Sequence, residues 1–303
     1  MNQHTLSKEY KFEGKGLHTG RYSHLCLKPA PADTGIVFVR TDMGENVFVH
    51  ALASNVSSTA RSTTLQEGDA SVATVEHILS ALTGLGIDNA YIEIDNIEVP
   101  ILDGSSRLYC EAIKADGAVA QDSERKFLEL DHEIEVRDEK SGSYVKITPS
   151  DKLEYHITVD FNSRVLGVQE ASWAPGDEYA SEIGVCRTFV FFHEIEFLFN
   201  QNLVKGGDVE NAIVIVEHPA TGEQVDRLAK LFNVGSLAVN DSGYLNNLEL
   251  HFPNECGRHK LLDLIGDIRL AGGYLKARIE AYKPGHSINT KAARAAMDAL
   301  KAE

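Results

Sequence analysis

The chain is poor in the residues that cross-link or stiffen a small protein. Its 303 residues include 4 cysteines, 8 prolines and 1 tryptophan. The cysteines stand alone at positions 26, 110, 186 and 256 without a CxxC pair, which excludes a Cys-pair zinc motif and argues against a disulfide framework. No run of ~18 apolar residues occurs, so the sequence predicts no membrane-spanning helix and no stable membrane insertion.

Positive charge is also scarce. The chain has 29 Lys and Arg against 45 Asp and Glu, a formal net charge of −16. Nucleic-acid binding needs clustered cations, so we expect no nucleic-acid partner. An anionic small substrate needs only a local cationic pocket and stays compatible with this charge. The first residues, MNQHTLSKEY, lack the apolar run of a signal peptide, and with reduced thiols this predicts a cytoplasmic protein.

Hydrophobic periodicity predicts two halves with a common order of elements. Each half has strands, a helix with a His near its start, a Gly stop and another strand. We therefore expect an α+β fold of two similar domains, 1–120 and 127–303, joined by a polar linker at 115–126. The expected elements are strands within 10–60, at 90–95, 127–136, 143–161 and 274–282, helices at 74–84, 259–271 and 290–302, and a strand–helix–strand insert at about 187–217.

The helix predicted at 259–271 carries a polar stripe. His259, Asp263 and Asp267 are spaced i, i+4, i+8 and therefore lie on one face of the helix. Two ligands at i, i+4 have the separation that a tetrahedral metal ion requires. The alternative interpretation of this spacing is a solvated polar stripe.

The helix predicted at 74–84, with Thr74 as its N-cap, carries the pair Glu76-His77. A His ligand beside a Glu that accepts a proton is half of the zinc-protease motif, but Ala81 stands where the second His would be. Other ligands must come from elsewhere. His259 and Asp263 would complete a three-ligand site with an open fourth position, the form of a catalytic zinc site. A half-buried structural histidine is the alternative for His77.

Two further segments contain candidate catalytic residues. In KPGHSIN (283–289) the Pro-Gly turn predicts that His286 lies on a loop, where it suits a proton donor or is an ordinary exposed histidine. In CRTFVFF (186–192) Thr188 offers a hydroxyl donor to a developing oxyanion, a weak signal by itself because Thr is common in strands.

Together these segments resemble the UDP-3-O-acyl-N-acetylglucosamine deacetylase (LpxC) family. The matching segments are GKGLHTG (14–20), TVEHILSALTGLGIDN (74–89), EVPILDGSS (98–106), CRTFVF (186–191), KGGDVENAIVIV (205–216), RHKLLDLIGD (258–267) and PGHSIN (284–289). They span nearly the whole chain in the family's order. The likeness is greatest to members in which the deacetylase is fused to a hydroxyacyl-carrier-protein dehydratase. The resemblance implies an active site between the two α+β domains.

The resemblance also implies a role for each site residue. The implied metal ligands are His77, His259 and Asp263, and the implied catalytic residues are Glu76 as general base, His286 as general acid, Asp267 as its electrostatic partner, and Thr188 and Lys260 at the reacting carbonyl or the substrate. The implied substrate-binding residues are Phe189 beside the sugar and, along an acyl-chain passage, Phe192, Ile195, Val209, Ala212 and Val214. Ordinary core packing is the alternative for this apolar group.

The implied reaction is zinc-dependent hydrolysis of an acylated UDP-amino sugar to acetate and a free amine, the committed step of lipid A biosynthesis. A His₂Asp site with an open position also tolerates Fe²⁺. Thr148 stands where well-known members carry a substrate-binding Lys, which Lys146 or Lys152 would replace. Two alternatives remain open, namely another N-acyl amide substrate and a non-catalytic sugar-nucleotide binding protein. The sequence leaves acyl-chain length and oligomeric state open.

Overall fold

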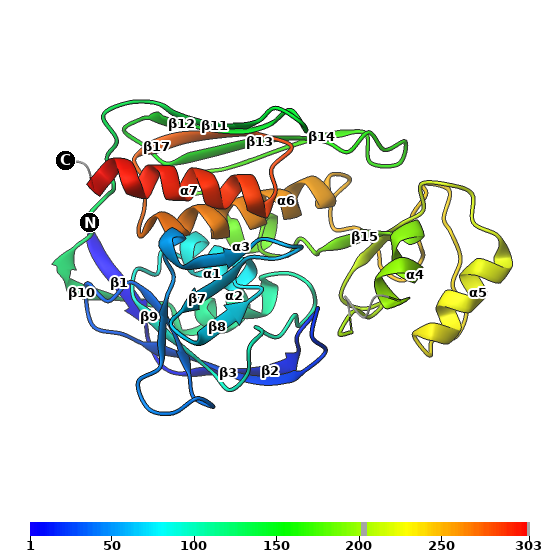
Figure 1. Cartoon of the computed structure of the whole chain (residues 1–303), viewed down its shortest axis with the longest axis horizontal. Helices are drawn as coiled ribbons and strands as arrows, with labels where there is room; N and C mark the ends of the chain where they lie inside the picture. Colours follow the sequence, from blue (N-terminus) through cyan, green and yellow to red (C-terminus); the bar gives the residue numbers. More distant parts are fainter. Residues whose placement is uncertain (201–204, 302–303) are drawn as a thin grey trace.

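The computed structural model of the chain describes residues 1–200 and 205–301. Its first half is built on a five-stranded sheet (Figure 1). In spatial order this sheet contains β2 (Tyr10–Lys15), β3 (Tyr22–Pro29), β9 (Ala90–Ile94), β4 (Ile36–Arg40) and β5 (Phe48–His50). Alternation sets the buried face, since Leu25 and Leu27 on β3 are buried whereas His24 between them is exposed. Two helices of this half, α1 (Glu76–Gly84) and α2 (Arg107–Asp116), contact each other.

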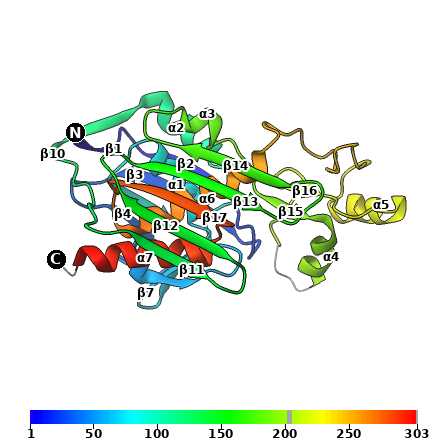
Figure 2. The same cartoon turned by 90° about the horizontal axis from the view of Figure 1, so that it is seen from above.

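The second half contains another five-stranded sheet, whose strands lie side by side in Figure 2. In spatial order it contains β11 (Ile134–Asp138), β12 (Ser143–Pro149), β17 (Ala277–Tyr282), β13 (Glu154–Asp160) and β14 (Val168–Trp173). It packs on α6 (Glu255–Ile268) and α7 (His286–Lys301).

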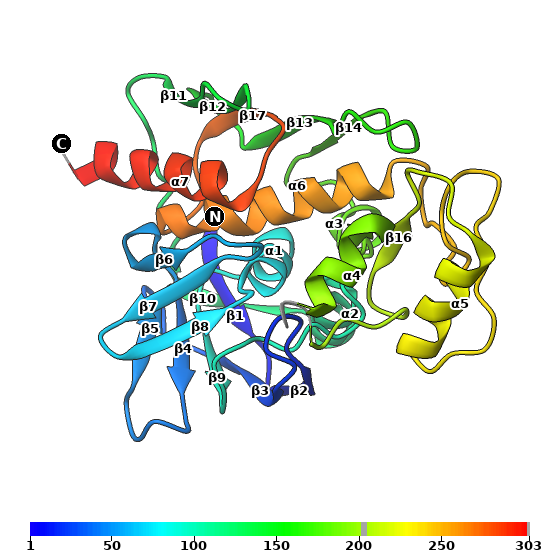
Figure 3. The ribbon, with the colours of Figure 1, turned by 45° about the vertical axis from the view of Figure 1, so that its right-hand side comes forward.

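The two sheets have the same topology. In each, the five strands counted along the chain take the spatial order first, second, fifth, third, fourth, and only the fifth and third are parallel. The likeness expected between the halves is therefore present as a repeated α+β arrangement. Figure 3 shows the layers as sheet, α6 and α7, α1 and α2, and sheet. Buried apolar residues of both halves form one continuous core across these layers.

Smaller elements surround this framework. They are β1 (Asn2–Leu6) paired with β10 (Ala118–Glu124), the sheet of β6 (Val56–Ser58), β7 (Thr64–Glu67) and β8 (Ala70–Ala73), the 3₁₀ helices Ala53–Asn55 and Arg269–Ala271, and the short helix α3 (Tyr179–Glu182). The expected linker at 115–126 contains the end of α2, at Asp116, and strand β10, which pairs with β1. Pairing between β10 and β1 is made by backbone hydrogen bonds and needs little apolar surface, so the side chains of this segment can be polar.

The insert in the second half has the expected strand–helix–strand order. β15 (Phe189–Phe191), α4 (Phe192–Asn200) and α5 (Gly222–Leu231) lie beside the layers in Figure 1, and β16 (Ile213–Ile215) pairs in parallel with β15. The sequence analysis did not predict α5. Residues 201–204, within the expected 187–217 unit, and the last residues of the expected 290–302 helix and 127–303 domain lie outside the described residues.

Several predicted element ends are wrong. Thr74 does not cap α1, because its backbone has φ +59° and its hydroxyl donates to the carboxylate of Glu98 at 2.9 Å. The 259–271 helix begins four residues earlier, at Glu255, and turns into a 3₁₀ helix at Arg269. The strands predicted at 127–136 and 274–282 begin later, at Ile134 and Ala277. Tertiary contacts override the local propensities at these ends.

Candidate metal centre and catalytic cavity

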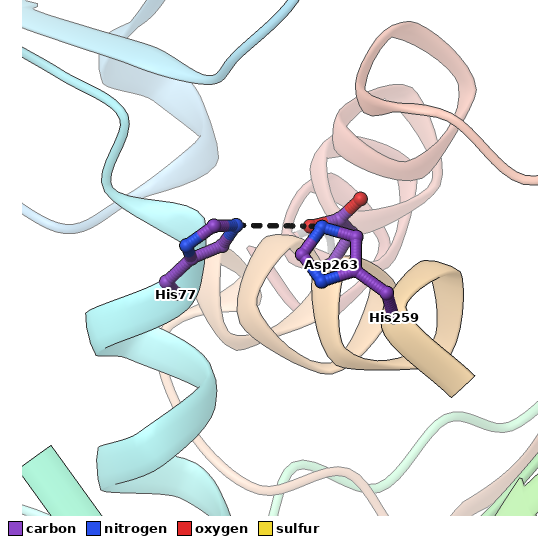
Figure 4. Close-up of side chains that lie close together, drawn as sticks. All are labelled: His77, His259 and Asp263. Carbon is purple, nitrogen blue, oxygen red and sulfur yellow. Dashed lines mark ion pairs between the residues drawn. The ribbon is translucent and has the colours of Figure 1, made fainter. Parts of the chain in front are cut away.

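Two helices distant in sequence bring three potential ligands together. His77 on α1 and the pair His259 and Asp263 on α6 offer ligand atoms that all lie within 4.8 Å of one another. Figure 4 shows both imidazoles directed toward the carboxylate of Asp263. All three residues are buried, with 6%, 2% and 2% of their surface exposed. A solvated polar stripe on α6 is therefore excluded.

The cluster fits a divalent cation. Oδ1 of Asp263 is buried and has no hydrogen-bond donor among the described residues. It lies 3.6 Å from Nε2 of His77 and 3.5 Å from Nε2 of His259. An unsatisfied buried carboxylate oxygen is costly, and a cation between the three groups would satisfy it. Two imidazoles and one carboxylate are the donor set of many zinc sites.

Neighbouring groups set the orientation and the pKa of the potential ligands. Nδ1 of His259 lies 3.0 Å from the backbone oxygen of Cys186, which fixes the ring and leaves Nε2 toward the cluster. Burial lowers the pKa of His259 to about 3, so its imidazole is neutral and able to bind a metal. Burial raises the pKa of Asp263, but the ammonium of Lys260, 2.6 Å from Oδ2, outweighs it and holds the pKa well below the usual range.

A buried carboxylate and a buried imidazole flank the cluster. Glu76 is 3% exposed, and its Oε2 accepts the N–H of Thr63 at 3.0 Å. Nε2 of His286 lies 3.7 Å from Oε1 of Glu76, and its Nδ1 lies 3.0 Å from Oδ2 of Asp267. Burial raises the pKa of Glu76. The positive charge of His286 lowers this pKa but does not outweigh burial. Burial lowers the pKa of His286, but the charges of Asp267 and Glu76 outweigh it and raise the pKa to about 9.

The loop position predicted for His286 is wrong. This residue is the first of α7, because the helix begins directly after the Pro-Gly turn, and its side chain is 10% exposed. It is therefore a buried residue at the start of a helix, held by the carboxylate of Asp267, rather than a mobile exposed one.

A cavity of about 280 Å³ opens onto the cluster. Its lining contains residues of both halves and of the insert, namely Leu17, His18, Arg61, Thr74, Glu76, His77, Phe161, Thr188, Phe189, His259, Lys260, Asp263 and His286. The structure thus brings together every ligand and catalytic residue expected from the sequence except Asp267, which lies behind His286. Thr148, Lys146 and Lys152 do not line this cavity; Thr148 and Lys146 both contact Glu133.

An apolar pocket of about 120 Å³ shares part of this lining. Leu17, His18, Arg61, Thr188 and Phe189 border both spaces. Of the expected passage residues, the apolar pocket is lined by Ile195, Val209, Ala212 and Val214. Phe192 is not in its lining and packs instead on the small core of the insert.

Sequence reasoning missed some residues of the site. Leu17 and His18 lie in the GKGLHTG segment, which contributed to the family resemblance but was not assigned to the site. Arg61 and Thr63 gave no such signal, because they lie in a polar stretch between β6 and β7 whose partners are distant in sequence.

The layered α+β fold carries a buried His₂Asp cluster of the kind that can hold a metal ion, with the side chains of Glu76 and His286 beside it. Comparison with known proteins identifies the family to which the chain belongs. The sequence model of the LpxC family, described as UDP-3-O-acyl N-acetylglycosamine deacetylase, matches residues 3–298. The chain belongs to this family of deacetylases.

The names of curated relatives agree with this family assignment. The chain is 42% identical over 294 residues to the bifunctional enzyme LpxC/FabZ of Porphyromonas gingivalis, an alignment covering 97% of this chain and 64% of the relative. It is 40% identical over 294 residues to the bifunctional enzyme LpxC/FabZ of Bacteroides thetaiotaomicron, with the same coverage. It is 39% identical over 298 residues to the UDP-3-O-acyl-N-acetylglucosamine deacetylase of Pseudomonas entomophila, covering 97% and 89%. The chain thus spans somewhat less than two thirds of the bifunctional relatives.

No helix among the described residues has both the length and the apolar composition needed to cross a lipid bilayer.

Proposed function

We propose that the protein is a Zn²⁺-dependent hydrolase that removes acetate from UDP-3-O-acyl-N-acetylglucosamine in the cytoplasm, the committed step of lipid A biosynthesis. The observation that carries the proposal is the buried cluster of His77, His259 and Asp263, which faces a cavity shared with Glu76 and His286. The names of the deacetylase relatives support the substrate. The division into domains 1–120 and 127–303 is part of this proposal, with the site between them.

His77, His259 and Asp263 would hold the ion, and Fe²⁺ suits the same donors. When bound, such an ion supplies Lewis-acid polarisation of the substrate carbonyl and lowers the pKa of water. The other steps belong to the chain itself. Glu76, adjacent to the ligands, accepts a proton from the water that attacks the acetamide carbon. Burial raises its pKa, which makes the carboxylate a stronger base than an exposed one.

Departure of the amine requires a proton on nitrogen. His286 has a pKa raised to about 9 and is therefore an imidazolium at neutral pH, able to donate from Nε2 while Asp267 holds Nδ1. The hydroxyl of Thr188 and the ammonium of Lys260 line the same cavity and are placed to stabilise the negative carbonyl oxygen. The C–N bond then breaks, and acetate and the free amino sugar leave.

The adjacent apolar pocket supports an acylated substrate. Its lining by Ile195, Val209, Ala212 and Val214 suits a hydrocarbon chain, and it joins the polar cavity at Thr188 and Phe189. Another N-acyl amide substrate remains the second candidate. Such a substrate, without a long acyl chain, would leave the apolar pocket empty. The experiment below distinguishes the two candidate substrates.

The test compares acetate release from acylated and non-acylated UDP-N-acetylglucosamine by the zinc-loaded protein. We expect a strong preference for the acylated compound. Glu76→Ala should retain zinc and lose on the order of 10²–10⁴ in kcat, because it removes general-base catalysis. Glu13→Ala, which changes a carboxylate whose side chain is 64% exposed, is the matched control and should not affect kcat. Equal turnover of both compounds would refute the acyl specificity, and normal turnover by Glu76→Ala would remove this residue from the mechanism.

A further inference from the structure

Thr63 connects the two proton-transfer groups of the site, although it lies outside both sequence motifs that carry them. It precedes β7 and is fully buried. Its backbone N–H donates to Oε2 of Glu76 at 3.0 Å, and its backbone oxygen accepts the N–H of Val75 at 3.3 Å. The segment before β7 is therefore bound to the start of α1.

The side chain of Thr63 reaches the other half of the molecule. Its hydroxyl donates to Oδ1 of Asp267 at 2.6 Å. Oδ2 of Asp267 accepts the amide of Asn289 at 3.0 Å and lies 3.0 Å from Nδ1 of His286. Asp267 is fully buried, and the hydroxyl is the only hydrogen bond that the described residues give to Oδ1.

We infer that Thr63 is a positioning residue for the proposed deacetylation. It does not line the 280 Å³ cavity, so it acts through other groups rather than on the substrate. Its hydroxyl fixes the carboxylate of Asp267 in the orientation that presents Oδ2 to His286, while its backbone holds Glu76. One residue thereby sets the base and the acid relative to each other across the two halves. This inference rests on the proposed roles of Glu76 and His286.

The first test is kinetic. Thr63→Val keeps the shape of the side chain but leaves Oδ1 of Asp267 without its donor, and we expect kcat to fall by about 10- to 100-fold. KM should change by less than about twofold, because no substrate contact is removed. Thr63→Ser restores the hydroxyl and should recover most of kcat. Thr83→Val is the matched control, because among the described residues the buried hydroxyl of Thr83 bonds only the backbone of Leu79 on α1.

The second test asks whether Thr63 acts through Asp267. In an Asp267→Ala background, Thr63→Val should cause no further loss of kcat, because the acceptor of the hydroxyl is already gone. Full additivity of the two substitutions would overturn the inference. If Thr63→Val does not fold, Thr63→Cys replaces it, since a thiol is a weak donor of similar size.

The third test does not depend on turnover. The imidazole of His286, identified by its absence from the spectrum of His286→Gln, is titrated by NMR in the zinc-loaded protein. We expect Thr63→Val to shift its pKa, because the carboxylate of Asp267 loses both a hydrogen-bond donor and its fixed orientation, whereas Thr63→Ser leaves the pKa as in the wild type. An unchanged pKa in Thr63→Val overturns the inference. Absent deacetylation by the wild type would refute the proposed function instead, and this titration would still decide the role of Thr63.

Discussion

Burial changes the chemistry of the individual residues at this site. Asp267 is fully buried, and Thr63, Asn289 and His286 all contact its two oxygens. Asp263 differs, since its Oδ1 faces two imidazoles and has no donor among the described residues. The first carboxylate is satisfied by the protein itself, whereas the second is left for a cation. Two aspartates one turn of α6 apart therefore have different surroundings.

The raised pKa of His286 predicts a pH dependence of stability. Its folded-state pKa of about 9 lies above the ordinary value of 6.5, so its contribution is complete below pH ~6.5 and is lost as pH rises through about 9. We expect the unfolding free energy of the wild type, relative to His286→Gln, to fall by about 2–3 kcal/mol across this interval. Urea unfolding at several pH values measures it. Parallel pH curves for the two proteins would contradict the shifted pKa.

At the scale of elements, the site depends on the close approach of α1 and α6. Glu76 and His77 begin α1, and their partners occupy successive turns of α6. The two helices are in close contact at Gly266, where an added Cβ would lie 2.1 Å from the backbone oxygen of Glu76. A side chain there would separate the base and His77 from the other ligands. Glycine at this position is thus required by packing between helices and not by the backbone conformation of α6.

Gly266→Ala tests this approach. The methyl group would force α1 away from α6, and overpacking of this kind costs about 1–3 kcal/mol. We expect a lower free energy of unfolding and weaker zinc binding, measured by urea unfolding and by metal titration. Gly222→Ala is the control, because a Cβ on this first residue of α5 would meet nothing within 4 Å. Wild-type stability and zinc affinity in Gly266→Ala would show that the helices have room to adjust.

At the scale of the whole molecule, two sheets of one topology enclose the helices that carry the site. His77 comes from the first half, and His259 and Asp263 come from the second. An ion held by all three would link the halves as well as serve catalysis. It would bind the folded chain and not the unfolded one, because only folding brings the three ligands together.

Zinc should therefore raise the stability of the entire chain. With free zinc at about 100 times its dissociation constant, the gain is about 2.7 kcal/mol. We expect a chelator to lower the Tm of the wild type and zinc to restore it, measured by thermal unfolding with parallel metal analysis. His259→Ala should lose zinc and this response together. His24→Ala, in which the substituted side chain is 63% exposed, should keep both. An equal zinc response in His259→Ala would refute the ligand assignment.

Local patterns in the sequence were sufficient for much of this description. The i, i+4 spacing placed His259 and Asp263 on one helix face, and the repeated order of elements indicated two like halves. Glu76 beside His77 indicated a base next to a ligand. Such features depend on residues within a few turns of each other, where periodicity alone sets the geometry.

Only the tertiary structure decided which distant groups meet. The hydroxyl of Thr63 bonds Asp267 across 204 positions, and the orphaned oxygen of Asp263 faces an imidazole from α1. Burial lowers the pKa of both His259 and His286, and only the charges of Asp267 and Glu76, which the fold places beside His286, raise the pKa of that residue. The amino-acid sequence by itself determined the helix faces and the kinds of chemistry they carry, because these follow from local periodicity. The pairing of groups and their charge states followed from the fold, because both depend on long-range contacts and exclusion of water.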